Sequence, residues 1–383
     1  MRPGLRRPFL GLGALLVCST LVGCDDEPAD RTCPETAGVI CPWAGTGEAG
    51  FNGEGLSLRE SRFYWPVDVS FTSSGTYILD WNNHRVRHLT DAGTLETVIG
   101  TDFVGDGPPD QSDLTQPGAL GTTIDLNHPT QVIEMEDGRL LLAAWHNHKL
   151  RVYDPDTGYV YVACGRGAGF DPGDGAIEDA RLNQPHAVRF GPDGMLYVLD
   201  QRNQRIRRIS SFDAGGTIET VVGTGTPGFS GDGGSPLMAE VHFPKGSNPP
   251  PGGSLDFDEQ GRLYFADTLN NRIRRVDFAA DTIETVYGDG ETGTLNFPRD
   301  VEAGPDGRIY FVDEFNHRVL ALEPDSLEVE VVVGTGTSGN EGDYGPANAA
   351  TLNRPSGIAF DADGNLYVSD TYNHRIRMVR AGF

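Results

Sequence analysis

Three features of the sequence predict an all-β fold built from six repeated units. A ten-residue segment, DTYNHRIRMV from Asp370, has close copies upstream, including DWNNHRVRHL from Asp80 and DTLNNRIRRV from Asp267. Short apolar runs separated by turn residues recur with these copies. The 383 residues also include 51 glycines and 25 prolines, which indicates frequent turns and argues against long helices. Such self-similarity is typical of repeat architectures.

The clearest unit, 184–223, contains four short apolar runs of the kind that form strands. We expect these strands at 186–190, 195–199, 205–209 and 218–222. A Gly-Pro-Asp-Gly sequence at 191–194 predicts a tight turn between the first two. Each unit is therefore predicted to be a four-stranded antiparallel sheet.

Six units are counted by the residue that ends the second strand, namely Asp80, Ala144, Asp200, Asp267, Asp313 and Asp370. An Asn follows three positions later in every unit, and an Arg or Lys two positions after that. A single sheet cannot bury both faces, whereas six sheets arranged radially cover one another. The sequence therefore predicts a six-bladed β-propeller. Since repeated residues lie all around a ring, we interpret the Asp, Asn, Arg and His of this motif as structural, with an Asp–Arg bond fixing the turn.

The sixth unit ends after its third strand, so its fourth strand must come from elsewhere. The segment VICPWAGTG at 39–47 resembles VVGTG at 221–225, the end of a regular fourth strand. We expect this N-terminal strand to complete the last blade, so that the propeller spans 39–383. Cys33 and Cys41 are close enough to form a disulfide that holds the closing strand, with a gain of roughly 2 to 3 kcal/mol. Cys164 is then a lone buried thiol.

The N-terminus has the pattern of an export signal. Three arginines precede an apolar run at 9–22 that is too short to span a membrane as a helix, which predicts a signal peptide at 1–23. The sequence Leu-Val-Gly-Cys at 21–24 resembles the lipobox of bacterial lipoproteins. That resemblance implies a lipid on Cys24, a tether at 24–38, and a place in the bacterial cell envelope, periplasmic or at the cell surface. The alternative is an ordinary signal peptide that contains a cysteine.

The net charge of −25 makes nucleic acid a poor partner, because its phosphates require a basic face. Acidity of this size favours solubility instead.

Three motifs resemble those of the NHL-repeat family of six-bladed propellers. They are the Asp-x-x-Asn-His-Arg-Ile core at 370–376, the Pro-Asp-Gly-x-Leu-Tyr turn at 192–197 and the Gly-Thr-Gly linker at 223–225. The resemblance covers about residue 39 to the end and implies the fold. It implies no single function, because relatives include binding scaffolds, RNA-binding domains and a few lyases.

Function is expected in the residues that differ between units. The turns after the second strands and the linkers between blades emerge on one face, where sites are usually built. At the two positions after the repeated Asp, consecutive units supply aromatic residues: Phe315, Tyr372, Trp81, Trp145 and His146. Exposed aromatics in an arc can stack on a sugar or anchor a peptide. We therefore predict a binding scaffold for an envelope protein, a peptide or a glycan, and the alternative is that each ring packs on its neighbouring loop.

A second constellation suggests a metal-dependent lyase or hydrolase. His128, His186 and His242 lie within two residues of the proline that opens the first strand, which faces the central channel. The lyases of the NHL-repeat family are similar in holding a metal by channel histidines. The three histidines here occupy three different offsets from the proline, whereas equivalent sites would share one. We expect no cofactor, with a channel divalent metal, or calcium at the Gly-rich loops or at 361–365, as alternatives.

Overall fold

The structure is a computed structural model that describes residues 32–171, 173–246 and 249–382. The chain divides into two units, Met1–Thr32 and Cys33–Phe383, and the second contains every strand of the described residues. The predicted signal peptide and Cys24 lie outside the described residues and stay predictions. Among the residues that are described, no helix is long and apolar enough to cross a bilayer.

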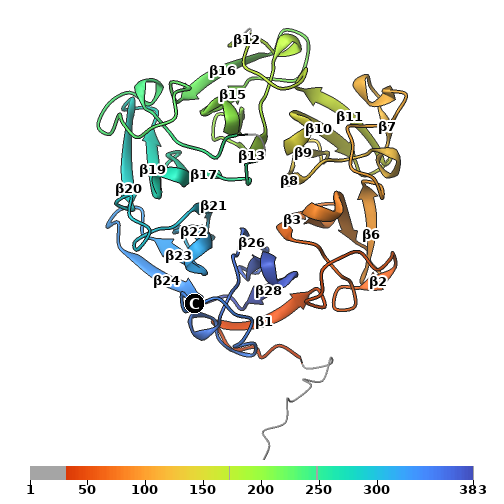
Figure 1. Cartoon of the computed structure of the whole chain (residues 1–383), viewed down its shortest axis with the longest axis vertical. Helices are drawn as coiled ribbons and strands as arrows, with labels where there is room; N and C mark the ends of the chain where they lie inside the picture. Colours follow the sequence, from red (N-terminus) through yellow and green to blue (C-terminus); the bar gives the residue numbers. More distant parts are fainter. Residues whose placement is uncertain (1–31, 172, 247–248, 383) are drawn as a thin grey trace, which may run out of the picture. The chain divides into compact units, whose positions relative to one another are not determined.

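Six antiparallel sheets surround a common axis, and Figure 1 shows them as blades that follow one another in sequence order. The predicted six-bladed propeller is thereby confirmed. The innermost strand of each blade contacts the innermost strands of both neighbouring blades. These inner strands are β3 (Pro66–Thr72), β8 (Pro129–Glu134), β13 (Pro185–Phe190), β17 (Leu255–Phe257), β21 (Pro298–Ala303) and β26 (Gly357–Phe360).

The remaining strands follow outwards in each blade. The second strands are β4 (Gly75–Asp80), β9 (Leu140–Ala144), β14 (Leu196–Asp200), β18 (Leu263–Asp267), β22 (Ile309–Asp313) and β27 (Leu366–Asp370). The third strands are β5 (Arg85–Leu89), β10 (Lys149–Asp154), β15 (Arg205–Ile209), β19 (Arg272–Asp277), β23 (Arg318–Leu322) and β28 (Arg375–Val379). The outer strands are β6 (Thr94–Ile99), β11 (Tyr159–Cys164), β16 (Thr217–Val222), β20 (Thr282–Tyr287), β24 (Val329–Val333) and β1 (Val39–Ala44).

Four blades gain a short fifth strand that the sequence did not predict. The linker that enters each of these blades runs along the outer strand of the same blade and forms β2 (Leu56–Ser57), β7 (Ala119–Leu120), β12 (Gly175–Ala176) and β25 (Gly345–Pro346). Single 3-10 turns complete the linkers at η2 (Ser112–Leu114), η3 (Gly121–Thr123), η5 (Ile177–Asp179), η7 (Pro236–Met238) and η10 (Ala347–Ala349). An extra strand covers hydrogen-bonding groups that an outer edge would otherwise expose.

The N-terminal strand β1 closes the ring as predicted. Ile40 pairs with Val379 of the last blade, in the same way that Ile218 of β16 pairs with Ile209 in the third blade. Both outer strands skip one residue at the same place in the register. The N-terminal segment thus reproduces a regular fourth strand residue by residue, although the partner strand lies at the opposite end of the chain.

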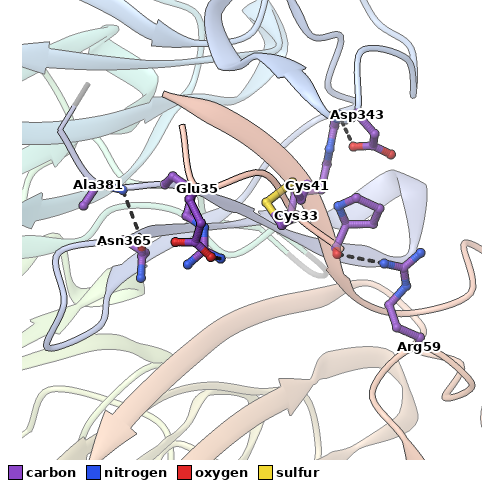
Figure 2. The surroundings of a disulfide bond; sticks show 10 residues. Cys33, Glu35, Cys41, Arg59, Asp343, Asn365 and Ala381 are labelled. Atoms are coloured by element: carbon purple, nitrogen blue, oxygen red, sulfur yellow. Dashed lines mark hydrogen bonds and ion pairs between the residues drawn. A yellow bond between two sulfur atoms is a disulfide. The ribbon is translucent and has the colours of Figure 1, made fainter. Parts of the chain in front are cut away.

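The expected disulfide joins Cys33 to Cys41, with Cα atoms 5.8 Å apart. Figure 2 shows it beside β1 and near Arg59, whose Nη1 donates a hydrogen bond of 2.9 Å to the carbonyl oxygen of Pro42. The bond closes a short loop within the N-terminal segment and does not join that segment to β28. Ring closure therefore depends on strand pairing and apolar burial. Cys164 is a buried free thiol.

Six apolar clusters hold the blades together, and each fills the space between two adjacent blades. The cluster between blades five and six contains Ile40 from β1, and the cluster between blades six and one contains Ala44 from the same strand. Both side chains are fully buried. The closing strand therefore contributes to two of the six blade interfaces.

The repeated Asp and Asn fix the turn after the second strand. In blade three Asp200 accepts a hydrogen bond of 2.7 Å from the backbone N–H of Asn183 and another of 2.7 Å from the Asn203 side chain. Blade two has Ala144 instead, and there the Asn147 side-chain oxygen accepts the equivalent backbone N–H at 3.0 Å. The Asn thus substitutes for the missing carboxylate.

The left-handed residue of this turn is the one after the Asn. Each turn is a 3-10 helix: η1 (Trp81–Asn83), η4 (Trp145–Asn147), η6 (Gln201–Asn203), η8 (Thr268–Asn270), η9 (Glu314–Asn316) and η11 (Thr371–Asn373). The next residue has φ between 50° and 58° and is His84, His148, Gln204, Asn271, His317 or His374. Its side chain accepts a hydrogen bond of 2.9–3.4 Å from a backbone N–H of the following blade. Six such bonds link all six blades, so the motif histidines have a structural role.

In three blades the Asp–Arg bond involves a different arginine from the one we expected. The expected pair is present in blade five, where Arg318 Nε lies 2.8 Å from Asp313, and in blade six, where Arg375 Nε lies 3.5 Å from Asp370. In blades three and four the Asp contacts instead a fully buried arginine two positions after the expected one. Arg207 lies 3.3 Å from Asp200, and Arg274 lies 3.5 Å from Asp267. Residues two apart in a strand share a face, which is why either arginine can reach the turn.

Candidate functional site

A cavity of about 340 Å³ opens between the turns that follow the second strands. Aromatic side chains line one side of it, charged side chains line another, and the segment Pro249 to Pro251 borders it. The size and the mixed lining are typical of small-molecule sites, which span about 300–1,000 Å³. We call this space the aromatic cavity.

The aromatic side is a row of ring contacts that crosses blades six, one and two. Tyr372 stacks on Trp65, with ring centroids 4.9 Å apart and planes inclined by 23°. Trp65 lies 6.0 Å from Trp81, and Trp81 lies 4.2 Å from the ring of His128. His146 completes the row at 4.9 Å from His128. All five rings are half-buried, so part of each remains accessible.

Trp145 differs from the expected exposed aromatic because it is fully buried. The His146 ring stacks on Trp145 with ring centroids 3.8 Å apart, and Nε1 of Trp145 donates a hydrogen bond of 3.0 Å to the Gln201 side-chain oxygen. The Gln201 amide in turn donates to the carbonyl oxygens of Pro244 and Pro250, at 2.8 and 3.1 Å. Trp145 therefore packs beneath His146 and, through Gln201, fixes the position of the segment Pro249 to Pro251.

Phe315 lies outside the lining of the aromatic cavity. Its ring stacks on Phe297 at 4.8 Å, and the guanidinium of Arg354 lies over it at 4.3 Å. Phe315 thus behaves as the alternative anticipated, in which a ring packs on its neighbours.

Trp65 was missed by the sequence reasoning. It immediately precedes Pro66, the residue that opens β3, and its backbone N–H donates to His374 of the previous blade at 3.4 Å. The same position carries His128 in blade two and Arg354 in blade six, which also line the cavity. The signal that could have found Trp65 is therefore the position before the strand-opening proline, which faces the turns.

The two histidines of the cavity are neutral at pH 7. Burial, together with neighbouring His84 and His146, lowers the pKa of His128 to about 3. Burial also lowers the pKa of His146 to about 4. His128 Nε2 lies 3.1 Å from the Asn82 side-chain oxygen, and its Nδ1 lies 2.9 Å from Nδ1 of His146. These rings therefore contribute hydrogen-bonding and stacking surface without charge.

The charged side of the cavity is built around one buried carboxylate. Arg354 donates to Glu314 through Nε and Nη2, at 3.0 and 2.7 Å, and through Nη1 to the Tyr372 hydroxyl at 2.9 Å. Arg299 donates to the other oxygen of Glu314 at 3.3 Å. Arg354, held by Glu314, thus fixes the position of Tyr372 and joins the aromatic row to the charged residues.

The structure does not bring His128, His186 and His242 together. His186 is buried on β13, where its Nδ1 contacts the carbonyl oxygen of Gly253, and burial with nearby Arg299 lowers its pKa to about 3. His242 uses its backbone N–H, which donates to Asp267 at 2.7 Å. Within the described ranges no three His, Cys, Asp or Glu side chains are grouped to hold a metal.

The 361–365 segment is a hairpin turn. The Asp361 side chain accepts hydrogen bonds from the backbone N–H of Asp363 and Asn365, at 3.0 and 2.8 Å, and from the Tyr367 hydroxyl at 2.9 Å. These bonds fix the turn between β26 and β27.

Buried carboxylates dominate the opposite end of the axis, where a second cavity of about 270 Å³ lies. Arg189 pairs there with Asp256 at 3.1 Å and also with Glu302. Burial and neighbouring Asp300 raise the pKa of Asp68 to about 7. The two ends of the propeller axis therefore differ, with aromatic rings at one end and acids at the other.

Comparisons with known proteins agree with this architecture. The family model for the NHL repeat matches residues 352–377. Protein SUPPRESSOR OF QUENCHING 1, chloroplastic, of Arabidopsis thaliana is 25% identical over 87% of this chain and 26% of its own length. Human NHL repeat-containing protein 2 is 24% identical over 84% of this chain and 40% of its own length. The chain thus spans well under half of either relative.

Solved structures show the same fold at low sequence identity. A structural genomics protein from Bacteroides thetaiotaomicron has a TM-score of 0.60 at 15% identity, covering 88% of this chain and 74% of its own. An auxiliary nutrient binding protein from the same organism has a TM-score of 0.58 at 16% identity, covering 89% and 75%. The chain is thus a six-bladed β-propeller that carries an NHL repeat.

Proposed function

We propose that this chain is an extracytoplasmic binding module that is held at the bacterial envelope by a lipid on Cys24 and takes a saccharide into the aromatic cavity. The observation that carries the proposal is the gathering of Trp65, Trp81 and Tyr372 in one cavity. Flat rings of this kind stack on sugar faces and supply much of the binding energy of small sites.

We favour a glycan end over the protein and peptide partners that the sequence left open. A space of about 340 Å³ accepts a ring of single-sugar size. The similarity in fold to an auxiliary nutrient binding protein gives further support to a binding role.

Tryptophan fluorescence tests this function directly. The half-buried Trp65 and Trp81 line the cavity, the buried Trp145 lies behind them, and the fourth tryptophan, Trp43, packs elsewhere against Phe71 and Tyr367. Titration with a panel of mono- and oligosaccharides should change the emission, and Trp81→Ala should require about tenfold more saccharide for the same fractional change. The control Trp43→Phe should respond like the wild type. Unchanged emission across the whole panel would contradict the proposal.

The lipid is tested separately, by labelling cells with a radioactive fatty acid. The chain with native Cys24 should take up label and stay with the membrane fraction, and Cys24→Ala should do neither. Labelling of the alanine variant would contradict the anchor without affecting the binding role.

A further inference from the structure

The aromatic cavity carries positive charge although the chain as a whole is acidic. The sequence has a net charge of −25, but the charged residues that line the cavity are Arg299, Arg354 and Glu314. The two histidines that line it are neutral at pH 7. Two guanidinium groups therefore face one carboxylate, and the balance favours an anionic ligand.

The geometry around Glu314 shows that this pair of arginines suits a carboxylate. Arg354 holds one oxygen of Glu314 with two nitrogens, and Arg299 approaches the other oxygen. Planar guanidinium groups match carboxylate geometry, and charge-assisted hydrogen bonds of this type are about twice as strong as neutral ones.

Arg299 has most of its donors to spare. A guanidinium carries five N–H donors, and within the described residues Arg299 makes one hydrogen bond, of 3.3 Å, to Glu314. The residue is only 6% exposed, and it lines both the aromatic cavity and a smaller one of about 20 Å³ beneath it. A buried charged group with unused donors is uncommon, and a ligand carboxylate would satisfy it.

A ring-shaped part of the ligand would lie against the aromatic side. Arg354 lies over the Tyr372 ring at 4.2 Å, and Tyr372 stacks on Trp65, so the charged and aromatic surfaces are continuous.

We infer that the aromatic cavity binds an acidic sugar, a uronic acid at a glycan end, with its carboxylate on Arg299 and Arg354 and its ring on Trp65 and Trp81. This inference rests on the proposed saccharide binding and deepens it. The carboxylate distinguishes this ligand class from the neutral sugars, which fill the same volume but leave the Arg299 donors unpaired.

The test compares sugars that differ only in charge. Galacturonate and glucuronate, their methyl esters, galactose and glucose are titrated against the purified protein by calorimetry. One of the two acids should bind about tenfold or more tightly than its own ester, because a hydrogen bond to a charged group contributes about 1.5–3 kcal/mol. Equal affinity of acid and ester would overturn this inference while leaving saccharide binding intact. No binding by any compound would contradict both.

Two variants test whether Arg354 is responsible for the tighter binding of the acid. Arg354→Gln should reduce the ratio of acid to ester affinity to within about threefold, since it removes one of the two charges that the carboxylate contacts. Arg62→Gln is the matched control, because Arg62 pairs with Glu48 outside the cavity lining. Retention of the full ratio in Arg354→Gln, in a variant with the thermal stability of the wild type, would overturn the assignment. The comparison of acid with ester in the wild type decides the question even if the variant fails to fold.

Discussion

Replacing Ile40 by alanine tests ring closure quantitatively, because the chain contains its own reference. Ile40 in β1 and Ile218 in β16 occupy the same position in the register of an outer strand. Their exposed fractions are 0% and 1%, and each belongs to a cluster between two blades. If β1 is energetically a regular outer strand, Ile40→Ala and Ile218→Ala must reduce stability by similar amounts.

The expected size follows from the burial. Removing a buried isoleucine side chain down to alanine costs about 2–5 kcal/mol, through lost transfer energy and the space left behind. An unfolding entropy of about 2.1 cal/mol/K per residue gives about 0.7 kcal/mol/K for Cys33–Phe383. A loss of about 3 kcal/mol therefore lowers Tm by about 4 °C.

Differential scanning calorimetry of the wild type and both variants under one condition measures this shift. A Tm for Ile40→Ala within about 1 °C of the wild type, beside a shift of about 4 °C for Ile218→Ala, would refute closure by the N-terminal strand.

Three further predictions concern the scaffold. Cys33→Ala with Cys41→Ala should lower the free energy of unfolding by about 2–3 kcal/mol, measured in denaturant, and leave the ring intact; collapse of the fold would show that the disulfide closes it. His148→Ala should lose about 1–3 kcal/mol because a backbone N–H of the next blade loses its acceptor, whereas His148→Asn should stay near the wild type, since Asn271 makes the same bond in blade four. At pH 7 His146→Gln should be less stable than the wild type, and this gap in the free energy of unfolding should shrink as the pH falls from about 7 to about 4.5. The wild type loses stability in this range because its unfolded chain protonates His146 below pH 6.5, whereas its folded chain, with a pKa of about 4 for His146, does not. A gap that widens as the pH falls would contradict the burial of a neutral ring.

Much of the fold could be predicted from the sequence, because the signals are local and repeated. The recurrence of Asp370 and its equivalents defined the units, and the likeness of 39–47 to an outer strand placed β1. The spacing of Cys33 and Cys41 was enough for their disulfide. Each of these signals depends on a short segment, so no knowledge of distant contacts was needed.

The site was predicted only in outline, because accessibility depends on segments that are distant in the sequence. Trp145 is buried because Gln201 and the proline segment before blade four cover it, and neither lies near it in the chain. Trp65 stands before a strand-opening proline, where His128, Gln184, Phe297 and Arg354 stand in other blades, so the residue type at this position does not show which of these side chains meet in one cavity. The choice between two arginines at each turn depends on side-chain reach, as Arg207 and Arg318 show.

The central claim is that repeated residues build the propeller and that residues peculiar to single blades bind the ligand. The most direct measurement is the affinity of the preferred saccharide, by calorimetry, for two variants of matched thermal stability. Trp81→Ala should weaken binding by about tenfold or more, since a buried aromatic anchor is worth about 2 kcal/mol, while His148→Asn should bind like the wild type. Unweakened binding by Trp81→Ala would contradict the account.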